Sequence, residues 1–376
     1  MSKNLKTGKN NLNIVYAGRY NESEYLSGPE KVAKRIFSEH SKIFKTYFIQ
    51  YFFDGNRYSL KEKLFGIKKE QMNDNSVVYT LGIFRILPVF NSIKPNIVHV
   101  ITFERFAVIF FIYKLLHKIK IIYNEHGVVT YENYELKKVP YIKKIKDKFC
   151  EKMLLKYSDK IIFTSERTID IAEKYFKINE SKIVILSNGI DEKFYIPSKT
   201  AKNNIKPKVI FIYKNELYKS ALNFLKKFIE NYKGDLELYI ITKIGIDFKC
   251  GNNIGINLVS LKTTDGLAEF YNDKDVFLSL NKYDTFSIST AEAMASGLIP
   301  IITKETGISR YIDDNYNGYI VDFGNIDQLK DKVTKISNMS ADQRNRTGEN
   351  AKSVYESLAW NKIYETYNNI YQSLIK

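Results

Sequence analysis

The amino-acid sequence predicts two α/β domains, each a doubly wound, Rossmann-like parallel sheet with helices on both faces. The first observation is the length of 376 residues, which exceeds one compact core and suits two domains. The second is an alternation of short β-branched runs with longer amphipathic stretches; these runs are almost continuously apolar, as strands covered on both faces require. The third is a restart of this alternation after a polar, linker-like stretch at residues 195–206.

The first domain is expected over residues 1–195. Its strands are predicted from short runs of apolar residues at 13–17, 46–52, 76–80, 97–102, 119–123, 160–164 and 182–186. Amphipathic patterns predict its helices near residues 29–39, 104–118, 141–157 and 166–175. The longest apolar run, Phe106 to Tyr113, is far shorter than the roughly 20 residues of a membrane span, so we expect a buried helix segment there.

The second domain is expected over residues 196–358, and a closing helix over residues 359–376 should pack back toward the N-terminal domain. Strands of the second domain are predicted at 208–213, 236–242, 257–261, 275–280, 298–302 and 319–321. Its helices are predicted near 218–231, 264–271, 288–296, 326–337 and 341–355, and the closing helix, near 360–374, carries Trp360. Because ligands of open parallel sheets bind beyond the carboxyl ends of the strands, functional residues should directly follow strands.

The formal charge of +16 lies almost wholly in one half of the chain. Residues 1–200 carry 35 Lys and Arg against 21 Asp and Glu, a balance of +14, and the remaining residues carry only +2. The densest basic stretch runs from Lys137 to Lys160. Two interpretations stay open: a solvated helix face, or a surface that meets anionic lipid head groups. In the second case the first domain would face an acidic or lipid-linked acceptor at a membrane.

Several classes of protein are excluded or disfavoured. Cys150 and Cys250 cannot form a disulfide framework and lack the spacing of a zinc site, which indicates a reducing compartment. No export signal is visible, so we expect a cytoplasmic protein, either soluble or peripheral on the inner face of the membrane. The dinucleotide, phosphate-loop, kinase, RNA-recognition and zinc-finger patterns are missing from the sequence. A nucleic-acid partner would therefore rest on charge alone, and none is expected.

The most informative motif begins at Asp284 and reads DTFSISTAE to Glu292. It follows a predicted strand and opens a helix whose free backbone N–H groups suit a phosphate. An acid before the helix can hold sugar hydroxyls, and an acid inside the first turns can reach a ribose. The alternative is purely structural: Ser289 and Glu292 also have the spacing of a capping box.

Other candidates also follow predicted strands. Lys214 and Lys219 flank a strand-to-helix turn and can neutralise a diphosphate, or they are simply solvated lysines. Gly28 follows Ser27 in a predicted helix start, where it allows a ligand close to the backbone, or the segment is only a well-capped helix. His126, after the strand 119–123, is either a ligand-contacting or a structural histidine.

These motifs, taken in order, resemble the retaining glycosyltransferases of family 4 type, which have the GT-B fold of two Rossmann-like domains facing across a cleft. The segment from Tyr157 to Pro197 resembles the end of the family's N-terminal domain. FIYKNELYKS resembles its G-R-x4-K-G turn, and DTFSISTAEAMASGLIP resembles its E-x7-E block. The resemblance covers most of the chain.

The resemblance implies an acceptor-binding N-terminal domain, a donor-binding C-terminal domain and transfer of a hexose with retention of configuration, without a metal or other cofactor. The expected partners are a nucleotide diphosphate sugar, namely a UDP-sugar, and a glycan or lipid-linked acceptor. The implied catalytic residues are Asp284, on the donor sugar's hydroxyls, and His126. The implied donor-binding residues are Gly28, Lys214, Lys219, Thr285, Phe286, Ser287 and Glu292.

Two departures from the family pattern motivate an alternative function. The first acid of the pair is Asp284 rather than glutamate, and Lys214 stands in the arginine place. Because lysine cannot grip a phosphate bidentately, this exchange is not conservative. The alternative is a non-catalytic protein of the same fold that serves as a partner or acceptor-binding subunit.

Overall fold

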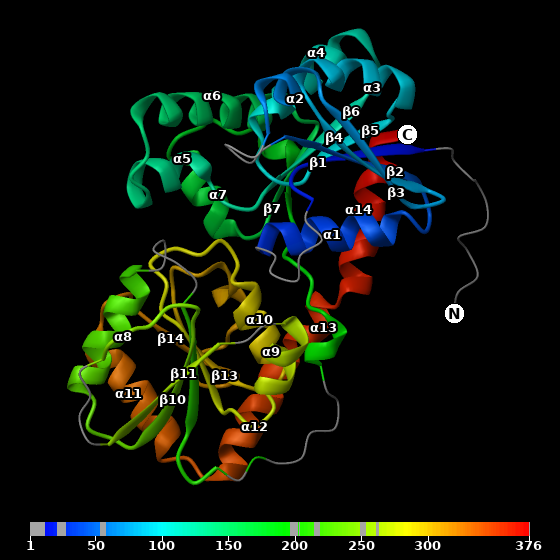
Figure 1. Cartoon of the computed structure of the whole chain (residues 1–376). Helices are drawn as coiled ribbons and strands as arrows, with labels where there is room; N and C mark the ends of the chain where they lie inside the picture. Colours follow the sequence, from blue (N-terminus) through cyan, green and yellow to red (C-terminus); the bar gives the residue numbers. More distant parts are fainter. Residues whose placement is uncertain are drawn as a thin grey trace. The chain divides into compact units, whose positions relative to one another are not determined.

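The structure is a computed structural model, which describes residues 12–20, 28–52, 58–195, 202, 204–213, 219–248, 253–260 and 263–375. The chain divides into two compact units, shown in Figure 1. The first comprises the described residues up to Phe163, then Ile171–Leu186 and the chain from Tyr364 onward. The second comprises Thr164–Asp170 and Ser187–Ile363. Each unit is built on a sheet of parallel strands with helices packed on it, which confirms the predicted fold class.

Within the described residues, the sheet of the first unit has eight strands in the order β3-β4-β2-β1-β5-β6-β7-β8. Their bounds are β1 Asn13–Ala17, β2 Lys45–Tyr51, β3 Ile67–Asn73, β4 Ser76–Leu81, β5 Ile97–Val100, β6 Lys120–Glu125, β7 Lys160–Phe163 and β8 Ile183–Ile185. All neighbours pair in parallel except β3 and β4. The strands β1, β5 and β6 are adjacent, so the residues that follow them gather at one edge of the sheet.

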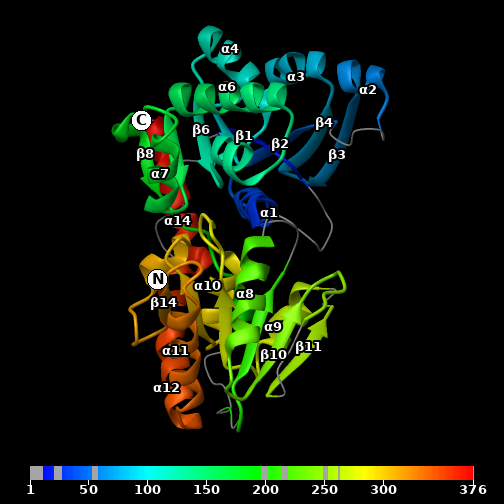
Figure 2. The same cartoon turned by 90° about the vertical axis from the view of Figure 1, so that its left-hand side faces the viewer.

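Helices cover both faces of this sheet. They are α1 Gly28–His40, α2 Leu60–Phe65, α3 Ile86–Ile93, α4 Ile109–Leu116, α5 Val129–Tyr131, α6 Tyr141–Tyr157 and α7 Glu166–Glu173, with short helical turns at Ile83–Arg85, Arg105–Val108, Glu132–Leu136 and Glu180–Lys182. The next turn, Glu192–Phe194, belongs to the second unit. Figure 2 shows α3, α4 and α6 over one face and α1 over the other. This division follows from right-handed crossovers, because α1 joins β1 to β2 in one direction along the sheet, whereas α3, α4 and α6 join β4 to β5, β5 to β6 and β6 to β7 in the other.

Four elements of the first unit, α2, β3, α3 and the short α5, were not predicted. The strand β3 is antiparallel to β4 and almost wholly exposed, with the sequence IKKEQMN. It therefore lacks the buried apolar run on which the sequence analysis relied. Its lysines lie on the outermost strand of the sheet, where charge protects an open edge from pairing with another chain.

Within the described residues, the sheet of the second unit has six strands, all parallel, in the order β11-β10-β9-β12-β13-β14. Their bounds are β9 Lys208–Ile212, β10 Leu236–Ile241, β11 Ile254–Val259, β12 Val276–Ser279, β13 Ile299–Thr303 and β14 Tyr319–Val321. The helices are α8 Lys219–Asn231, α9 Thr264–Phe270, α10 Ile288–Ala295, α11 Ile326–Ser337, α12 Ala341–Lys352 and α13 Val354–Leu358, with a short helical turn at Gly307–Tyr311. Every predicted strand and helix of this half is present, with ends shifted by a few residues.

The last helix, α14 Trp360–Ile375, belongs to the first unit from Tyr364 onward. A buried chain of hydrogen bonds joins it to the sheet. The Tyr371 hydroxyl lies 2.7 Å from His99 Nδ1 and 3.2 Å from the Tyr16 hydroxyl, which in turn lies 2.6 Å from His40 Nδ1. His99 Nε2 donates to Asn124 Oδ1, and Asn124 donates to the Tyr367 hydroxyl. Since unsatisfied polar groups are costly in a core, this network fixes α14 in one register.

Candidate functional site

A rigid loop follows β12 in the second unit, and Asp284 holds it together. Asp284 Oδ1 accepts hydrogen bonds from the backbone N–H groups of Ser287, at 2.8 Å, and Phe286, at 3.2 Å. Asp284 Oδ2 accepts one from the Asn281 side chain at 3.2 Å. We expected the N–H groups of residues 285–287 to face a sugar or a phosphate. Two of these N–H groups, those of Phe286 and Ser287, donate to Asp284 instead, so its carboxylate stabilises the conformation of the loop.

Neighbouring segments of the second unit hold the same loop from outside. The Thr285 carbonyl accepts hydrogen bonds from the Ser165 hydroxyl, at 2.8 Å, and the Thr164 hydroxyl, at 3.3 Å. The N–H group of Gly307 donates to the Asp284 carbonyl at 2.9 Å. The Phe286 side chain, only 1% exposed, is buried in the core of the unit. The loop is therefore fixed at four consecutive residues.

The loop ends in a strained residue. Ser287 precedes α10 with φ 67° and ψ 72°, in the left-handed region that residues other than glycine rarely adopt. Such strain collects at ligand-binding sites, where the surrounding contacts impose it. Ser287 rather than Ser289 is the N-cap, and it makes no side-chain capping bond. The capping-box explanation of Glu292 is therefore wrong, and the role of that acid must be sought elsewhere.

Glu292 and Lys219 lie in the same unit as the loop. Glu292 lies in α10 and is 3% exposed. The pKa of Tyr271 is raised chiefly by the burial of that tyrosine and, in second place, by the charge of Glu292. Lys219 is the first residue of α8 and is exposed. Ser279, Asn281, Asp284 and Ser289 line a small hollow at the end of β12. Lys214, Ser27 and Cys250 lie outside the described residues.

Gly307 is a sensitive support of this loop. A methyl group at this position would lie 2.0 Å from the Thr285 carbonyl oxygen and 2.6 Å from the Ser165 hydroxyl. Gly307→Ala should therefore displace the loop and lower the free energy of unfolding by about 2–3 kcal/mol. Urea denaturation would measure this loss. The matched control is Gly255→Ala, where no atom lies within 4 Å of the added carbon. Equal stability of the two variants would contradict the assigned support.

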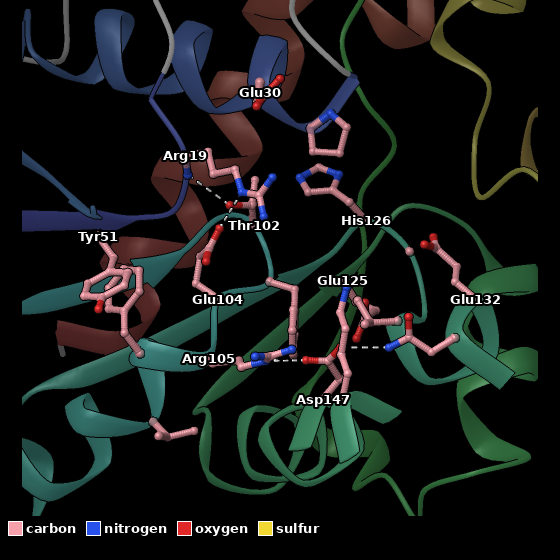
Figure 3. Close-up of a pocket in the computed structure, with 18 of the residues that line it drawn as sticks. Arg19, Glu30, Tyr51, Thr102, Glu104, Arg105, Glu125, His126, Glu132 and Asp147 are labelled. Carbon is pink, nitrogen blue, oxygen red and sulfur yellow. Dashed lines mark hydrogen bonds and ion pairs between the residues drawn. The ribbon is translucent and has the colours of Figure 1, made fainter. Parts of the chain in front are cut away.

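The first unit contains a pocket of about 960 Å³ beside the carboxyl ends of β1, β5 and β6 (Figure 3). Its lining residues come from the start of α1, the segment after β5, the segment after β6 and the first half of α6. They are Arg19, Pro29, Glu30, Tyr51, Ile83, Thr102, Phe103, Glu104, Arg105, Phe106, Val108, Ile109, Glu125, His126, Gly127, Val129, Glu132, Asn133, Lys137, Lys143 and Asp147. This volume accommodates a sugar unit or a larger ligand.

Charged side chains in this pocket lie in pairs. Arg19 Nε donates to Glu104 Oε1 at 3.0 Å, and Arg105 Nε donates to Asp147 Oδ1 at 2.5 Å. Lys137 pairs with Glu132. Asp147 also accepts a hydrogen bond from the side chain of Asn133 at 2.8 Å. Because each of these cations faces a carboxylate, the wall offers many hydrogen-bonding groups with little net charge, which suits hydroxyl groups better than a free anion.

Three titratable groups of the pocket, His126, Glu104 and Glu125, are shifted toward their neutral forms. Burial lowers the pKa of His126 to about 4, with a smaller contribution from His99. Burial, opposed by Arg19, raises the pKa of Glu104 to about 7. Burial and the nearby Glu151 raise the pKa of Glu125 well above its usual range. At neutral pH the His126 ring is therefore uncharged and Glu125 is protonated, so both can exchange hydrogen bonds with hydroxyl groups.

The structure brings some predicted residues together and adds others. His126 lines the pocket with Pro29 and Glu30, which directly follow Gly28 at the start of α1. The sequence analysis did not find Arg19, Glu104 or Asp147. Arg19 and Glu104 come shortly after β1 and β5, so the rule that placed His126 would have found them. Asp147 lies inside the lysine-rich helix α6, where no sequence signal separates it from a surface acid.

The described residues offer neither a metal-binding cluster nor a membrane-spanning helix. They contain no cluster of three or more His, Cys, Asp or Glu residues that could hold a metal ion. None of the helices in the described ranges combines the length and apolar character that a membrane crossing needs.

Two family models match the chain. The model described as Glycosyltransferase Family 4 matches residues 67–194, and the model described as Glycosyl transferases group 1 matches residues 248–354. The chain belongs to the family 4 glycosyltransferases. The first match lies within the half that contains the pocket, and the second includes the Asp284 loop, Glu292 and Gly307. The resemblance to glycosyltransferases of family 4 type is thereby confirmed.

Curated relatives of this family 4 glycosyltransferase are distant. An uncharacterized glycosyltransferase of Methanocaldococcus jannaschii is 24% identical over 221 residues, which are 54% of this chain and 62% of the relative. The UDP-Gal:alpha-D-GlcNAc-diphosphoundecaprenol alpha-1,3-galactosyltransferase of Escherichia coli is 20% identical over 58% of this chain and 60% of its own length. The chain thus spans about three fifths of the length of these two relatives.

Solved structures confirm the GT-B fold. The sucrose-phosphate synthase of Thermosynechococcus elongatus superposes with a TM-score of 0.73 at 12% identity, over 96% of this chain and 99% of that one. Anabaena HepE in complex with UDP-glucose superposes with a TM-score of 0.70 at 11% identity, over 96% of this chain and 100% of that one. At such low identity these similarities establish the fold alone.

Proposed function

We propose that this family 4 glycosyltransferase moves a hexose from a nucleotide diphosphate sugar to a glycan or lipid-linked acceptor, with retention of configuration and without a metal ion. The observation that carries the proposal is the fixed loop from Asp284 to Ser287, which ends in a strained residue at the start of α10. A backbone loop so constrained beside a helix N-terminus is suited to a sugar attached to phosphate. The UDP-glucose bound by Anabaena HepE supports UDP as the nucleotide.

In this proposal the second unit binds the donor. Asp284 contacts the sugar hydroxyls, and as its carboxylate turns toward them, the N–H groups of Phe286 and Ser287 become available to a phosphate oxygen. The Thr285 N–H completes this row. Glu292 binds the ribose hydroxyls. Lys219, together with Lys214, neutralises the diphosphate.

The reaction then needs no covalent intermediate with the protein. The bond between the sugar's anomeric carbon and the diphosphate oxygen breaks, and the acceptor oxygen forms its bond to the same face of that carbon. The proton of the acceptor hydroxyl passes to the departing diphosphate. The lysines and the N-terminus of α10 stabilise the negative charge that develops there, as fixed electrostatic groups do in other enzymes.

The first unit would bind the acceptor. The neutral ring of His126 can accept a hydrogen bond from a sugar hydroxyl, and Gly28 lets a ligand approach the start of α1. The paired charges of the pocket favour the uncharged sugar unit of an acceptor over an acidic one. The acceptor named for the Escherichia coli relative, a diphosphoundecaprenol-linked sugar, supports the lipid-linked class. This acceptor class also agrees with a cytoplasmic protein attached peripherally to the membrane.

A donor screen with the purified chain tests the proposal. Nucleotide sugars would be tested one at a time for binding by calorimetry and for hydrolysis or transfer by mass spectrometry. We expect one UDP-sugar to be consumed, with the product in the configuration of the donor. Binding without turnover would support the non-catalytic alternative. The absence of both at millimolar concentrations would refute the proposal.

Lys219→Ala should weaken the binding of nucleoside diphosphate about tenfold or more, because a hydrogen bond to a charged group contributes about 1.5–3 kcal/mol. Titration calorimetry with UDP would measure the change. The matched control is Lys227→Ala, an exposed lysine on the same helix about two turns further on. An unchanged affinity of the Lys219 variant would contradict its assigned role at the diphosphate.

A further inference from the structure

Helix α6 exposes an apolar stripe on the side opposite its packed face. Ile142, Ile145 and Phe149 are 67%, 47% and 60% exposed. At about 100° per residue they fall within about 60° of one another around the helix. The buried residues of α6, among them Cys150 and Leu154, lie on the other side. A helix packed on a soluble domain normally turns polar residues outward, so this stripe needs an explanation.

Lysines accompany the stripe. Between Lys137 and Lys160 the chain has nine lysines against three acidic residues. Two of the acids, Asp147 and Glu151, are buried and engaged by Arg105 and by Thr130, so they offset little of the charge at the surface. The exposed lysines therefore form a strongly basic border around exposed isoleucine and phenylalanine side chains.

Helix α4 extends this surface. Its Ile112, Leu115 and Leu116 are 55%, 85% and 77% exposed. The two helices are neighbours, since the rings of Phe111 and Tyr157 lie 5.6 Å apart and Lys114 donates to the Tyr157 carbonyl at 3.2 Å. Figure 2 shows α4 and α6 on the same face of the first sheet.

We propose that α4 and α6 form a docking face that binds an anionic lipid bilayer by inserting these apolar side chains while the lysines contact the head groups. Apolar residues bordered by lysines are the composition of helices that lie in the membrane interface. Charge decides between a bilayer and a second copy of this chain, because a two-fold contact would place the lysine border of one copy against that of the other. An anionic bilayer instead complements both parts of the face.

The docking face borders the pocket of the first unit. Lys143 lines the pocket, and its neighbour Ile142 belongs to the stripe. Lys137, Lys138 and Lys144 line a second hollow of about 670 Å³ next to Tyr134. This inference rests on the proposed function: the sugar of the acceptor enters the pocket, its phosphate meets Lys138 and Lys144, and its lipid stays in the bilayer.

Vesicle flotation tests the docking face independently of catalysis. The full chain would be mixed with vesicles of phosphatidylcholine containing about one third phosphatidylglycerol, and the partition coefficient would be measured. Ile145→Glu and Phe149→Glu should each lower it at least tenfold. The matched control Ile205→Glu, at a position 96% exposed in the second unit, should leave it unchanged. Equal binding of all four proteins, or none by the unmodified chain, would overturn the docking face.

Two further measurements distinguish insertion into the bilayer from a purely electrostatic contact and from self-association. Binding that needs phosphatidylglycerol and survives in the glutamate variants would mean a purely electrostatic contact and would refute insertion. Self-association that disappears in the same variants, measured by light scattering without vesicles, would show that a second copy covers the face. Transfer to a water-soluble acceptor should stay unchanged in both variants, so a failure of docking is distinguishable from a failure of the proposed activity.

Discussion

Replacing Asp284 by alanine should lower sugar transfer by about 100-fold or more, the usual effect of removing one preorganised group from a charge-stabilising site. The carboxylate orders the N–H groups of Phe286 and Ser287 in the structure and would contact the donor sugar in the proposed reaction. Its loss therefore removes a ligand contact and also releases the loop. The loss should appear in kcat, since the helix N-terminus and Lys219 still bind the diphosphate.

A conservative variant distinguishes the two roles of this residue. Asp284→Asn keeps an oxygen that can accept from the Ser287 N–H, so its melting temperature should stay near that of the unmodified chain while its activity falls. Steady-state kinetics with the donor found in the screen, together with thermal unfolding, would measure both effects. Full activity of the alanine variant would refute the placement of the donor at this loop.

Acid should unfold the first unit mainly below about pH 4.5. Burial lowers the pKa of His40 to about 3 and that of His99 to about 4, from an ordinary value near 6.5. Below pH 6.5 these histidines bind protons in the unfolded chain, whereas their buried rings in the folded chain stay neutral. Each histidine therefore lowers the free energy of unfolding by about 1.4 kcal/mol per pH unit as the pH falls toward 4.

Buried carboxyl groups raise the free energy of unfolding as the pH falls over part of this range. The pKa of Glu104 and that of Glu151 are each raised by burial to about 7, from 4.5. The stability that each contributes is complete below pH 4.5 and is lost as the pH rises through 7. His126 acts in the same direction as His40 and His99, and Glu125 in the same direction as Glu104 and Glu151. Between pH 6.5 and 4.5 three carboxyl gains therefore offset three histidine losses, so stability should change little. Below pH 4.5 the carboxyl groups add no further stability, whereas the histidines continue to lower the free energy of unfolding.

Glu104→Gln removes one of these opposing contributions. This variant should lose about 3 kcal/mol more than the unmodified chain between pH 7 and pH 4.5, which is the effect of a shift from 4.5 to about 7. Denaturation followed by circular dichroism at several pH values would measure it. Glu70→Gln, on the exposed strand β3, is the control and should follow the unmodified chain. If the free energies of unfolding of the Glu104 and Glu70 variants changed equally with pH, Glu104 would not offset the histidine losses.

The sequence predicted most elements that carry buried apolar runs, although the buried helix α3 was missed. The strand β1 and the helix α6 have the predicted ends, and β14 does as well. Where burial on two faces shapes a strand, its residue pattern is unambiguous. The strand β3 and the short helix α2 lack buried residues or nearly so, and the sequence offered no periodicity by which to predict them.

The site was predictable in its residue types and less so in its contacts. Asp284 was singled out as a ligand of sugar hydroxyls, yet its hydrogen bonds to two N–H groups depend on a left-handed Ser287 that no residue pattern announces. Ser165 contacts the Thr285 carbonyl from a position 120 residues earlier in the chain. Likewise, Asp147 pairs with Arg105 from a position 42 residues later in the chain. Pairings of this kind arise from the tertiary fold, and a single sequence does not contain them.

The division of the chain has a consequence for its dissection. The second unit includes Thr164–Asp170, which stands between β7 and β8 of the first unit, and the first unit includes the end of the chain. A fragment that stops at residue 195 would lack Tyr367 and Tyr371, so His99, Asn124 and Tyr16 would each lose one hydrogen-bond partner and the buried surface beneath α14 would be exposed. The complementary fragment would lack Ser165 beneath the Asp284 loop. We therefore expect neither fragment to fold as it does in the full chain, and binding of the proposed donor should depend on the presence of α14.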